Sequence, residues 1–273
     1  MAFSADKKFI FCVSPGRSGS NYLYHILSCA DHVCATHEPE HEHREYSHLT
    51  PRLWDLKNCP LPESYIRRKQ AKLAQINEMM SRTSADIYVE TNPLFCSLWQ
   101  DVILDELHDH DVIILMLRRN TSEVLKSLLD LGWFSTRDGN NWMTTAYSVN
   151  SLAQPVVTES EATPSELIIS YLMNVEMLAQ MIKKRCRKHG LTVIELDSNR
   201  LFGSNEIIAN LFTRCGLHTD TEKLNSIIFE TKNKPGISKK ILDTPLDACT
   251  KAIENYLKLC REHSLDIPGF PYT

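Results

Sequence analysis

The sequence lacks any long hydrophobic run and any pattern of paired cysteines. The early apolar segment Phe9 to Val13 is too short for the core of a signal peptide or for a membrane span, and no later segment approaches that length. The nine cysteines are scattered, with no CxxC pair, which indicates neither a disulfide framework nor a zinc site. These absences favour a reducing, cytoplasmic location without a membrane anchor.

A strong net charge is also missing. The formal charge of −4 and the isoelectric point near 6.3 give no support to wholesale binding of nucleic acid or of a membrane surface. Any anion-binding site must therefore be a local concentration of donors. The 273 residues, of which 42% are hydrophobic, can bury a substantial core, and we expect a single domain over residues 1–273.

Short apolar segments alternate with amphipathic ones along the chain. Apolar runs predict strands at Phe9 to Val13, Ile87 to Val89, Val112 to Leu117 and Thr192 to Leu196. Apolar residues spaced three and four apart predict helices at Ser20 to Cys29, Phe95 to Leu107, Ser122 to Leu131, Glu166 to His189, Asn205 to Cys215 and Leu246 to His263. This alternation predicts an α/β fold with a central parallel sheet that helices cover on both faces.

Two stretches, 37–62 and 133–164, fit this alternation poorly. We expect them to form a lid and an acceptor pocket above the strand ends. The aromatic residues that could line such a pocket are Trp133, Phe134, Trp142 and Tyr147, and the alternative is that they belong to the core. The basic segment Tyr65 to Arg82 predicts a long exposed helix whose charges face solvent.

The segment Ser14 to Asn21 joins a buried strand to a helix. Its interior residues are Pro15, Gly16, Arg17, Ser18, Gly19 and Ser20. The glycines permit unusual dihedrals and close backbone approach, the serines donate hydroxyls, and the arginine adds a permanent charge. Backbone N–H groups and a helix N-terminus that converge in this way attract phosphate or sulfate. The alternative is a plain turn, because Gly, Ser and Pro are common turn residues.

This segment differs from a Walker A loop. The pattern GxxxxGK[ST] is absent, and an arginine stands where a nucleotide kinase has its lysine. A Walker-type enzyme usually holds magnesium with an acidic residue at a strand end, yet the strand Val112 to Leu117 is followed by Arg118-Arg119-Asn120. Cations at that point suit an anion and not magnesium.

Two motifs together resemble one family. Pro15 to Ser20 resembles the 5′-phosphosulfate loop of sulfotransferases that use 3′-phosphoadenosine 5′-phosphosulfate (PAPS), in the arginine form of the carbohydrate and tyrosylprotein enzymes. In that family an arginine and a serine eight residues later hold the 3′-phosphate, and Arg119 and Ser127 have this spacing. The resemblance implies a P-loop-like α/β domain, with PAPS bound by residues 15–21, Arg119 and Ser127. It implies PAP as the product and no metal.

The resemblance extends to a catalytic carboxylate. Glu38 lies twenty-one residues after Arg17, a spacing like that of the family's glutamate, and a carboxylate there can take the proton of an acceptor hydroxyl. We predict Glu38 as the general base, with Arg17 also catalytic and with His37 and Glu40 as substitutes. An alternative groups His37, His41, His43 and His48 with Glu40 and Glu42 as a metal site, but no recognised ligand spacing is present.

A fourth similarity is looser. Residues 231–240 resemble the late basic loop that closes over the 3′-phosphate, which predicts contacts from Lys234 and Ser238, or else a solvated turn. The adenine-stacking residue is not placed. We expect a sulfotransferase that acts on a hydroxyl, or alternatively an amine, of a small-molecule or carbohydrate acceptor. The rivals are an atypical P-loop kinase and a non-catalytic anion-binding module.

Overall fold

The computed structural model describes residues 3–39, 59–139, 142–233 and 240–273. At its centre is a parallel sheet of five strands in the order β2-β3-β1-β4-β5. The strands are β1 (Lys8–Val13), β2 (Val33–Thr36), β3 (Ile87–Glu90), β4 (Asp111–Arg118) and β5 (Thr192–Asp197). The predicted α/β fold class is confirmed, and all four predicted strands are present with one or two extra residues.

Strand β2 was not predicted. It has four residues, lies at one edge of the sheet and pairs with β3 from Val33↔Ile87 to Thr36↔Glu90. A four-residue segment with only Val33 as a strongly β-forming apolar residue carries little periodicity of its own. Pairing with a neighbouring strand therefore decides its conformation.

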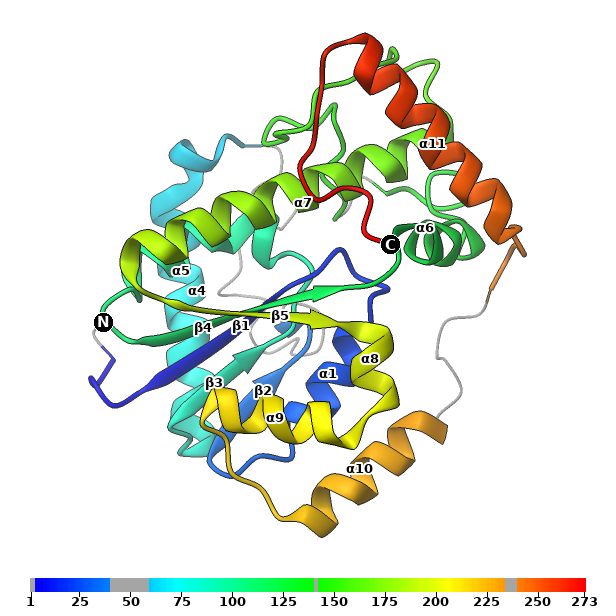
Figure 1. The fold of residues 1–273 in the computed structure, drawn as a ribbon. Coiled ribbons are helices and arrows are strands. Elements are labelled where there is room, and N and C mark those ends of the chain that lie inside the picture. The colour runs from blue at the N-terminus through cyan, green and yellow to red at the C-terminus, as the bar shows by residue number, and fades with distance from the viewer. Residues whose placement is uncertain (1–2, 40–58, 140–141, 234–239) are drawn as a thin grey trace.

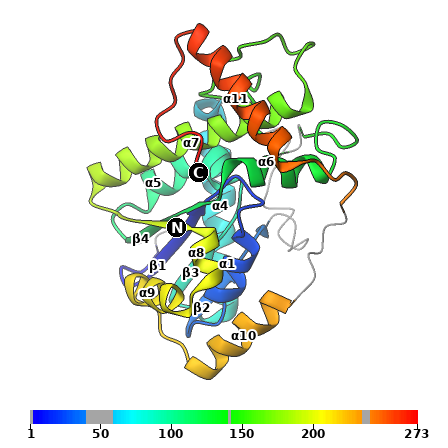
Figure 2. The same cartoon turned by 45° about the vertical axis from the view of Figure 1, so that its right-hand side comes forward.

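Helices connect the strands and cover both faces of the sheet (Figures 1 and 2). They are α1 (Ser20–Leu27), α4 (Leu61–Thr83), the π-helical turn η2 (Phe95–Trp99), α5 (Gln100–Glu106), α6 (Thr121–Asp130), α7 (Pro164–His189), α8 (Ser198–Gly203), α9 (Asn205–Cys215), α10 (Thr221–Asn233) and α11 (Leu246–Glu262). The boundaries follow local signals. Helix α7, for example, starts with a capping box between Thr163 and Glu166 and ends at Gly190 in the left-handed region.

The core has two parts because side chains of a strand alternate between its faces. Phe9 and Phe11 of β1 face one cluster, which includes α4, α5 and α7, whereas Ile10 and Cys12 face a second, which includes α1, α8 and α9. Figure 1 shows these two helix layers on opposite sides of the sheet. The central position of β1 and β4 brings their carboxyl ends together between the layers.

The predicted solvent-facing charges of α4 are partly wrong. Arg68 is fully buried and contacts Asp101 at 2.6 Å between Nη1 and Oδ1, and Lys72 is fully buried against Glu90. A basic side chain can be buried when a carboxylate neutralises it. Both partners come from distant parts of the chain, which is why the segment by itself predicts exposure.

Of the two stretches expected to form a lid and an acceptor pocket, the structure describes mainly the second. Residues 40–58 of the first lie outside the described residues, and α4 begins at Leu61. The described parts of the second, 133–139 and 142–163, are irregular, with a short bridge between Trp133 and Arg137. In the described parts of the chain, no helix is long and apolar enough to cross a membrane.

Candidate functional site

The loop between β1 and α1 has an unusual backbone. Gly16, Arg17 and Gly19 have positive φ angles of 70°, 54° and 92°. The Oγ of Ser14 accepts a hydrogen bond from Gly16 N at 3.2 Å, and the Oγ of Ser18 donates to Gly16 O at 3.1 Å. These two buried hydroxyls brace the loop from within. Left-handed residues among ordinary ones form the concave backbone that binds anions in other loops.

Helix α1 begins directly after this loop, with Gly19 as its N-cap and no side-chain capping hydrogen bond. The first N–H groups of a helix have no partner within the helix and carry a partial positive charge, so this end suits an anion. Ser20 is buried and Asn21 is exposed on the first turn. A Cβ at Gly19 would lie 2.0 Å from the ring of Phe202, so a larger residue here requires that ring to move as well as an unfavourable φ of 92°.

The two predicted anion-binding motifs meet in space. Arg17 Nε donates to Ser127 Oγ at 3.1 Å across 110 residues of sequence. Arg119 Nη1 donates to the carbonyl oxygen of Arg17, also at 3.1 Å. Partial desolvation and the charge of Arg119 lower the pKa of Arg17, while the charge of Glu38 opposes this. The carboxyl ends of β1 and β4 therefore bring two guanidinium groups to one point.

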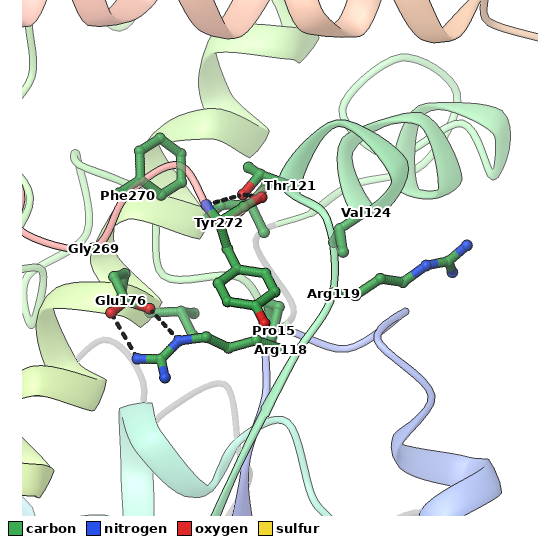
Figure 3. Close-up of a pocket in the computed structure, with 11 residues that line it drawn as sticks. Pro15, Arg118, Arg119, Thr121, Val124, Glu176, Gly269, Phe270 and Tyr272 are labelled. Carbon is green, nitrogen blue, oxygen red and sulfur yellow. Dashed lines mark hydrogen bonds and ion pairs between the residues drawn. The ribbon is translucent and has the colours of Figure 1, made fainter. Parts of the chain in front are cut away.

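The two arginines at the end of β4 have different environments. Arg118 donates to both carboxylate oxygens of Glu176, at 2.8 and 3.2 Å, and contacts Glu195 at 3.1 Å. Burial by itself would lower the pKa of Arg118, but these carboxylates outweigh it and raise the pKa. Arg119 extends to the opposite side (Figure 3) and pairs with Glu123 at 2.7 Å, where both side chains are about one-third exposed. Arg119 also donates to the loop carbonyl of Arg17, whereas Arg118 donates to the two carboxylates.

A small cavity lies behind the loop, next to Pro15, Arg118 and Glu176 (Figure 3). Its volume of about 50 Å³ is far below the roughly 300 Å³ at which ligand pockets begin. Tyr272 lines the cavity and is tied to Thr121 by two hydrogen bonds of 2.8 Å. In one, Thr121 N–H donates to Tyr272 O, and in the other, Tyr272 N–H donates to Thr121 Oγ1. We therefore assign this cavity to the packing behind the loop and not to a nucleotide.

The predicted catalytic residues follow β2. His37 Nδ1 lies 3.0 Å from Thr91 O and 2.9 Å from Thr91 Oγ1, and its Nε2 lies 3.7 Å from Glu38 Oε1. The side chain of Glu38 is 38% exposed and that of His37 is 15% exposed. The charge of Glu38 raises the pKa of Arg17 against the larger effects of burial and Arg119, so this carboxylate is near enough to Arg17 for an electrostatic interaction.

Several predicted residues lie outside the described part of the chain. They are Glu40, Lys234 and Ser238, together with His41, Glu42, His43 and His48 of the alternative metal site. Among the described residues, no three His, Cys, Asp or Glu side chains form a group that could hold a metal ion.

The structure adds Tyr171, which the sequence analysis missed. Its hydroxyl donates to Pro15 O at 2.7 Å, and burial, followed by the charges of Cys96 and Glu38, raises its pKa well above the ordinary value. Trp142 contacts the Tyr171 ring edge-on at 5.5 Å and covers Gly16. Helix α7 supplies Tyr171, and only its periodic apolar pattern was visible in the sequence.

The four predicted pocket aromatics divide into two groups. Trp133 and Trp142 contact each other at 5.6 Å between ring centroids and adjoin the loop through Tyr171. Phe134 instead covers Gly139, and the hydroxyl of Tyr147 donates to Val157 O within the second excursion. Trp133, Phe134 and Trp142 also pack against the hydrophobic core, as the alternative interpretation expects.

Of three comparisons with known proteins, only the one with solved structures gave a match. No family model matches the chain, and no curated protein matches it. Among solved structures, the chain is similar to the sulfotransferase domain of the olefin synthase from Synechococcus PCC 7002, with 96% of each chain covered, 16% sequence identity and a TM-score of 0.47.

Proposed function

We propose that the protein is a sulfotransferase that transfers the sulfuryl group of PAPS to a small-molecule or carbohydrate acceptor. The observation that carries this proposal is the contact of Arg17 with Ser127 and of Arg119 with the Arg17 carbonyl. These contacts join the two motifs that resemble the 5′- and 3′-phosphate elements of the family. Because β1 and β4 are neighbouring strands, any turns that follow them lie close together. The support comes from the identity of the residues in contact, which are the arginine and the serine that the two motifs single out.

Each group has a role that its position supports. Arg17 and the N–H groups at the start of α1 bind the 5′-phosphosulfate and stabilise the charge that develops on the departing phosphate oxygen. Arg119 and Ser127 bind the 3′-phosphate. The family resemblance adds Lys234 and Ser238, which lie outside the described residues, as further contacts. A sulfuryl group carries less charge than a phosphoryl group, so fixed cationic and N–H donors suffice for its transfer.

The acceptor's proton leaves toward the pair formed by His37 and Glu38. Glu38 is the general base of the proposal, since its carboxylate lies beside the loop and is partly exposed. The acceptor presents a hydroxyl, or alternatively an amine. The partly buried indoles of Trp133 and Trp142 suit the apolar face of a sugar or of an amphipathic small molecule.

Thermal unfolding with added nucleotides tests the proposal. PAP at a hundred times its dissociation constant should stabilise the protein by about 2.7 kcal/mol. AMP, which lacks the 3′-phosphate, should bind more weakly, and Arg119→Ala should bring the affinities for PAP and AMP close together. Arg214→Ala, at an exposed position of α9, is the matched control and should keep the preference for PAP.

Two outcomes would replace the proposal with its rivals. Stabilisation by ATP with magnesium but not by PAP would indicate a kinase. Binding of PAP without release of PAP from PAPS, across a screen of hydroxyl and amine acceptors, would indicate a non-catalytic module.

A further inference from the structure

Thr91 is held rigidly at the end of β3. It is fully buried, and its N–H donates to Thr36 O at 3.1 Å, which continues the pairing of β2 with β3. The preceding residue, Glu90, is also fully buried and forms a 2.7 Å ion pair with Lys72. The carbonyl and hydroxyl of Thr91 are therefore fixed relative to the strand that leads into His37.

These two oxygens face one nitrogen of His37. A carbonyl oxygen can only accept a hydrogen bond, so the 3.0 Å contact with Thr91 O is a hydrogen bond only when Nδ1 carries a proton, whereas the Thr91 hydroxyl at 2.9 Å can donate or accept. With the proton on Nε2 instead, the lone pair of Nδ1 would face the lone pairs of that carbonyl. The tautomer of a neutral histidine is set by the hydrogen bond that one ring nitrogen makes. The bond to Thr91 O favours the tautomer that has its proton on Nδ1.

This tautomer gives Nε2 a lone pair at the position closest to Glu38. Nε2 and Glu38 Oε1 are 3.7 Å apart, about 0.9 Å longer than a charge-assisted hydrogen bond. Catalytic hydrogen bonds are often this long before substrate binds and then shorten. If Nε2 gains a proton, the resulting N–H can approach the carboxylate directly.

We propose that Thr91 is a positioning residue that keeps the proton of neutral His37 on Nδ1, so that His37 Nε2 and Glu38 form one proton-accepting unit. The inference rests on the proposed function. As the acceptor oxygen bonds to sulfur, the bond from sulfur to the 5′-phosphate oxygen breaks and leaves its electron pair on that oxygen. The acceptor's proton passes to the unit, where Nε2 and Glu38 share it, and Thr91 O continues to accept from Nδ1–H.

The tautomer can be measured without turnover. Two-bond ¹H–¹⁵N correlation spectra of the labelled protein, with and without PAP, report which ring nitrogen of His37 carries the proton, and His37→Gln assigns the signals. We expect the Nδ1–H pattern in both states. An Nε2–H pattern would overturn the inference.

Variants of Thr91 test its hydroxyl separately from its carbonyl. In the proposed tautomer Oγ1 of Thr91 accepts from Nδ1–H alongside the carbonyl. Thr91→Val removes this acceptor and should raise the share of the Nε2–H tautomer about fivefold, because one hydrogen bond is worth about 1 kcal/mol. A lower share would show that the hydroxyl donates to Nδ1 and would overturn the inference. Thr91→Ser should restore the original spectrum. Thr213→Val, which removes an exposed hydroxyl from α9, is the matched control and should leave the spectrum unchanged.

The readouts separate this inference from the proposed function. A Thr91→Val spectrum identical to that of the unmodified protein would show that its hydroxyl has no positioning role. Loss of PAP binding in this variant would indicate a structural role instead and would also overturn the inference. If PAP fails to bind the unmodified protein, the proposed function is wrong whatever the spectrum. If PAP binds and His37 carries its proton on Nε2, only this inference is wrong.

Discussion

Two groups of charged residues lie at the carboxyl edge of the same sheet and differ in their exposure to water. At the end of β3, Lys72 and Glu90 are fully buried, and Glu90 also accepts from Asn92 at 3.0 Å and from the Tyr88 hydroxyl at 2.7 Å. At the ends of β1 and β4, Arg17 is exposed and Arg119 is 31% exposed. The first group is matched internally, whereas the second meets solvent.

The difference separates a structural role from a binding role. Buried charges are tolerated only when their partners and hydrogen bonds are complete, and such a group holds the chain in one arrangement. Exposed guanidinium groups keep their hydration and can exchange it for an anion. The Lys72–Glu90 pair therefore fixes the strand end that holds Thr91, while Arg17 and Arg119 are the side chains that we propose to bind the ligand.

Removing the buried cation should have the largest effect. Lys72→Met leaves Glu90 buried without its ion pair and should lower the free energy of unfolding by about 3 to 5 kcal/mol. Lys69→Met, on the same helix, breaks a part-exposed contact with Glu106 and should cost at most about 1 kcal/mol. Urea unfolding of both variants measures the contrast. Equal losses would contradict the distinction between the two groups of charges.

Removing the exposed cation should affect turnover and not folding. Arg17→Ala should reduce turnover of PAPS by about a hundredfold to a thousandfold, which is typical for the loss of one donor to a developing anion. Its melting temperature should stay close to that of the unmodified protein. The turnover of Arg17→Lys should lie between those of Arg17→Ala and the unmodified protein, since lysine keeps the charge but lacks the Nε donor to Ser127. A large fall in melting temperature for Arg17→Ala would assign this residue to the structural group.

The carboxylate beside the exposed cations should matter for the rate alone. Glu38→Gln should lower turnover by about a hundredfold or more, as expected for loss of a general base, with PAP affinity nearly unchanged. Measuring kcat together with PAP binding checks both parts. Normal turnover in this variant would remove Glu38 from its proposed role.

Substitution of Gly19 tests how closely the loop between β1 and α1 packs against α8. Gly19→Ala adds a Cβ 2.0 Å from the Phe202 ring at a φ of 92° and should cost about 1 to 3 kcal/mol of stability. It should also weaken PAP binding. Gly190→Ala has a φ of 69° and no atom within 4 Å of the new Cβ, so it should show only the backbone cost of about 1 kcal/mol and normal PAP binding. Equal losses for the two would show that Phe202 yields freely.

The smallest effect is expected from the partner of Arg119. Glu123→Gln removes a carboxylate that competes with an anion for this guanidinium, and PAP affinity should rise by up to about fivefold. The free energy of unfolding should change by less than about 1 kcal/mol, because the pair is partly exposed. Titration calorimetry with PAP measures the gain. A loss of affinity would show that Glu123 holds Arg119 in its binding position.

Local sequence predicted the central strands and most helices but missed one edge strand and two helices. The strands β1 and β4 are continuous apolar runs, as expected for strands that are buried on both faces, and the helix α9 matches its predicted bounds. Strand β2 and the helices α8 and α10 were missed. Each is short or polar, so its conformation depends on what it packs against and not on its own periodicity.

By itself, the sequence determined the anion loop, the eight-residue spacing from Arg119 to Ser127 and the α/β alternation, because glycine conformations and apolar periods act between near neighbours. Only the tertiary structure decided that Arg17 meets Ser127, that Lys72 is buried with Glu90 and that Thr91 faces His37. The partners in each of these contacts are at least 18 residues apart. Contacts over such separations depend on strand order, and strand order is set by the packing of the whole sheet.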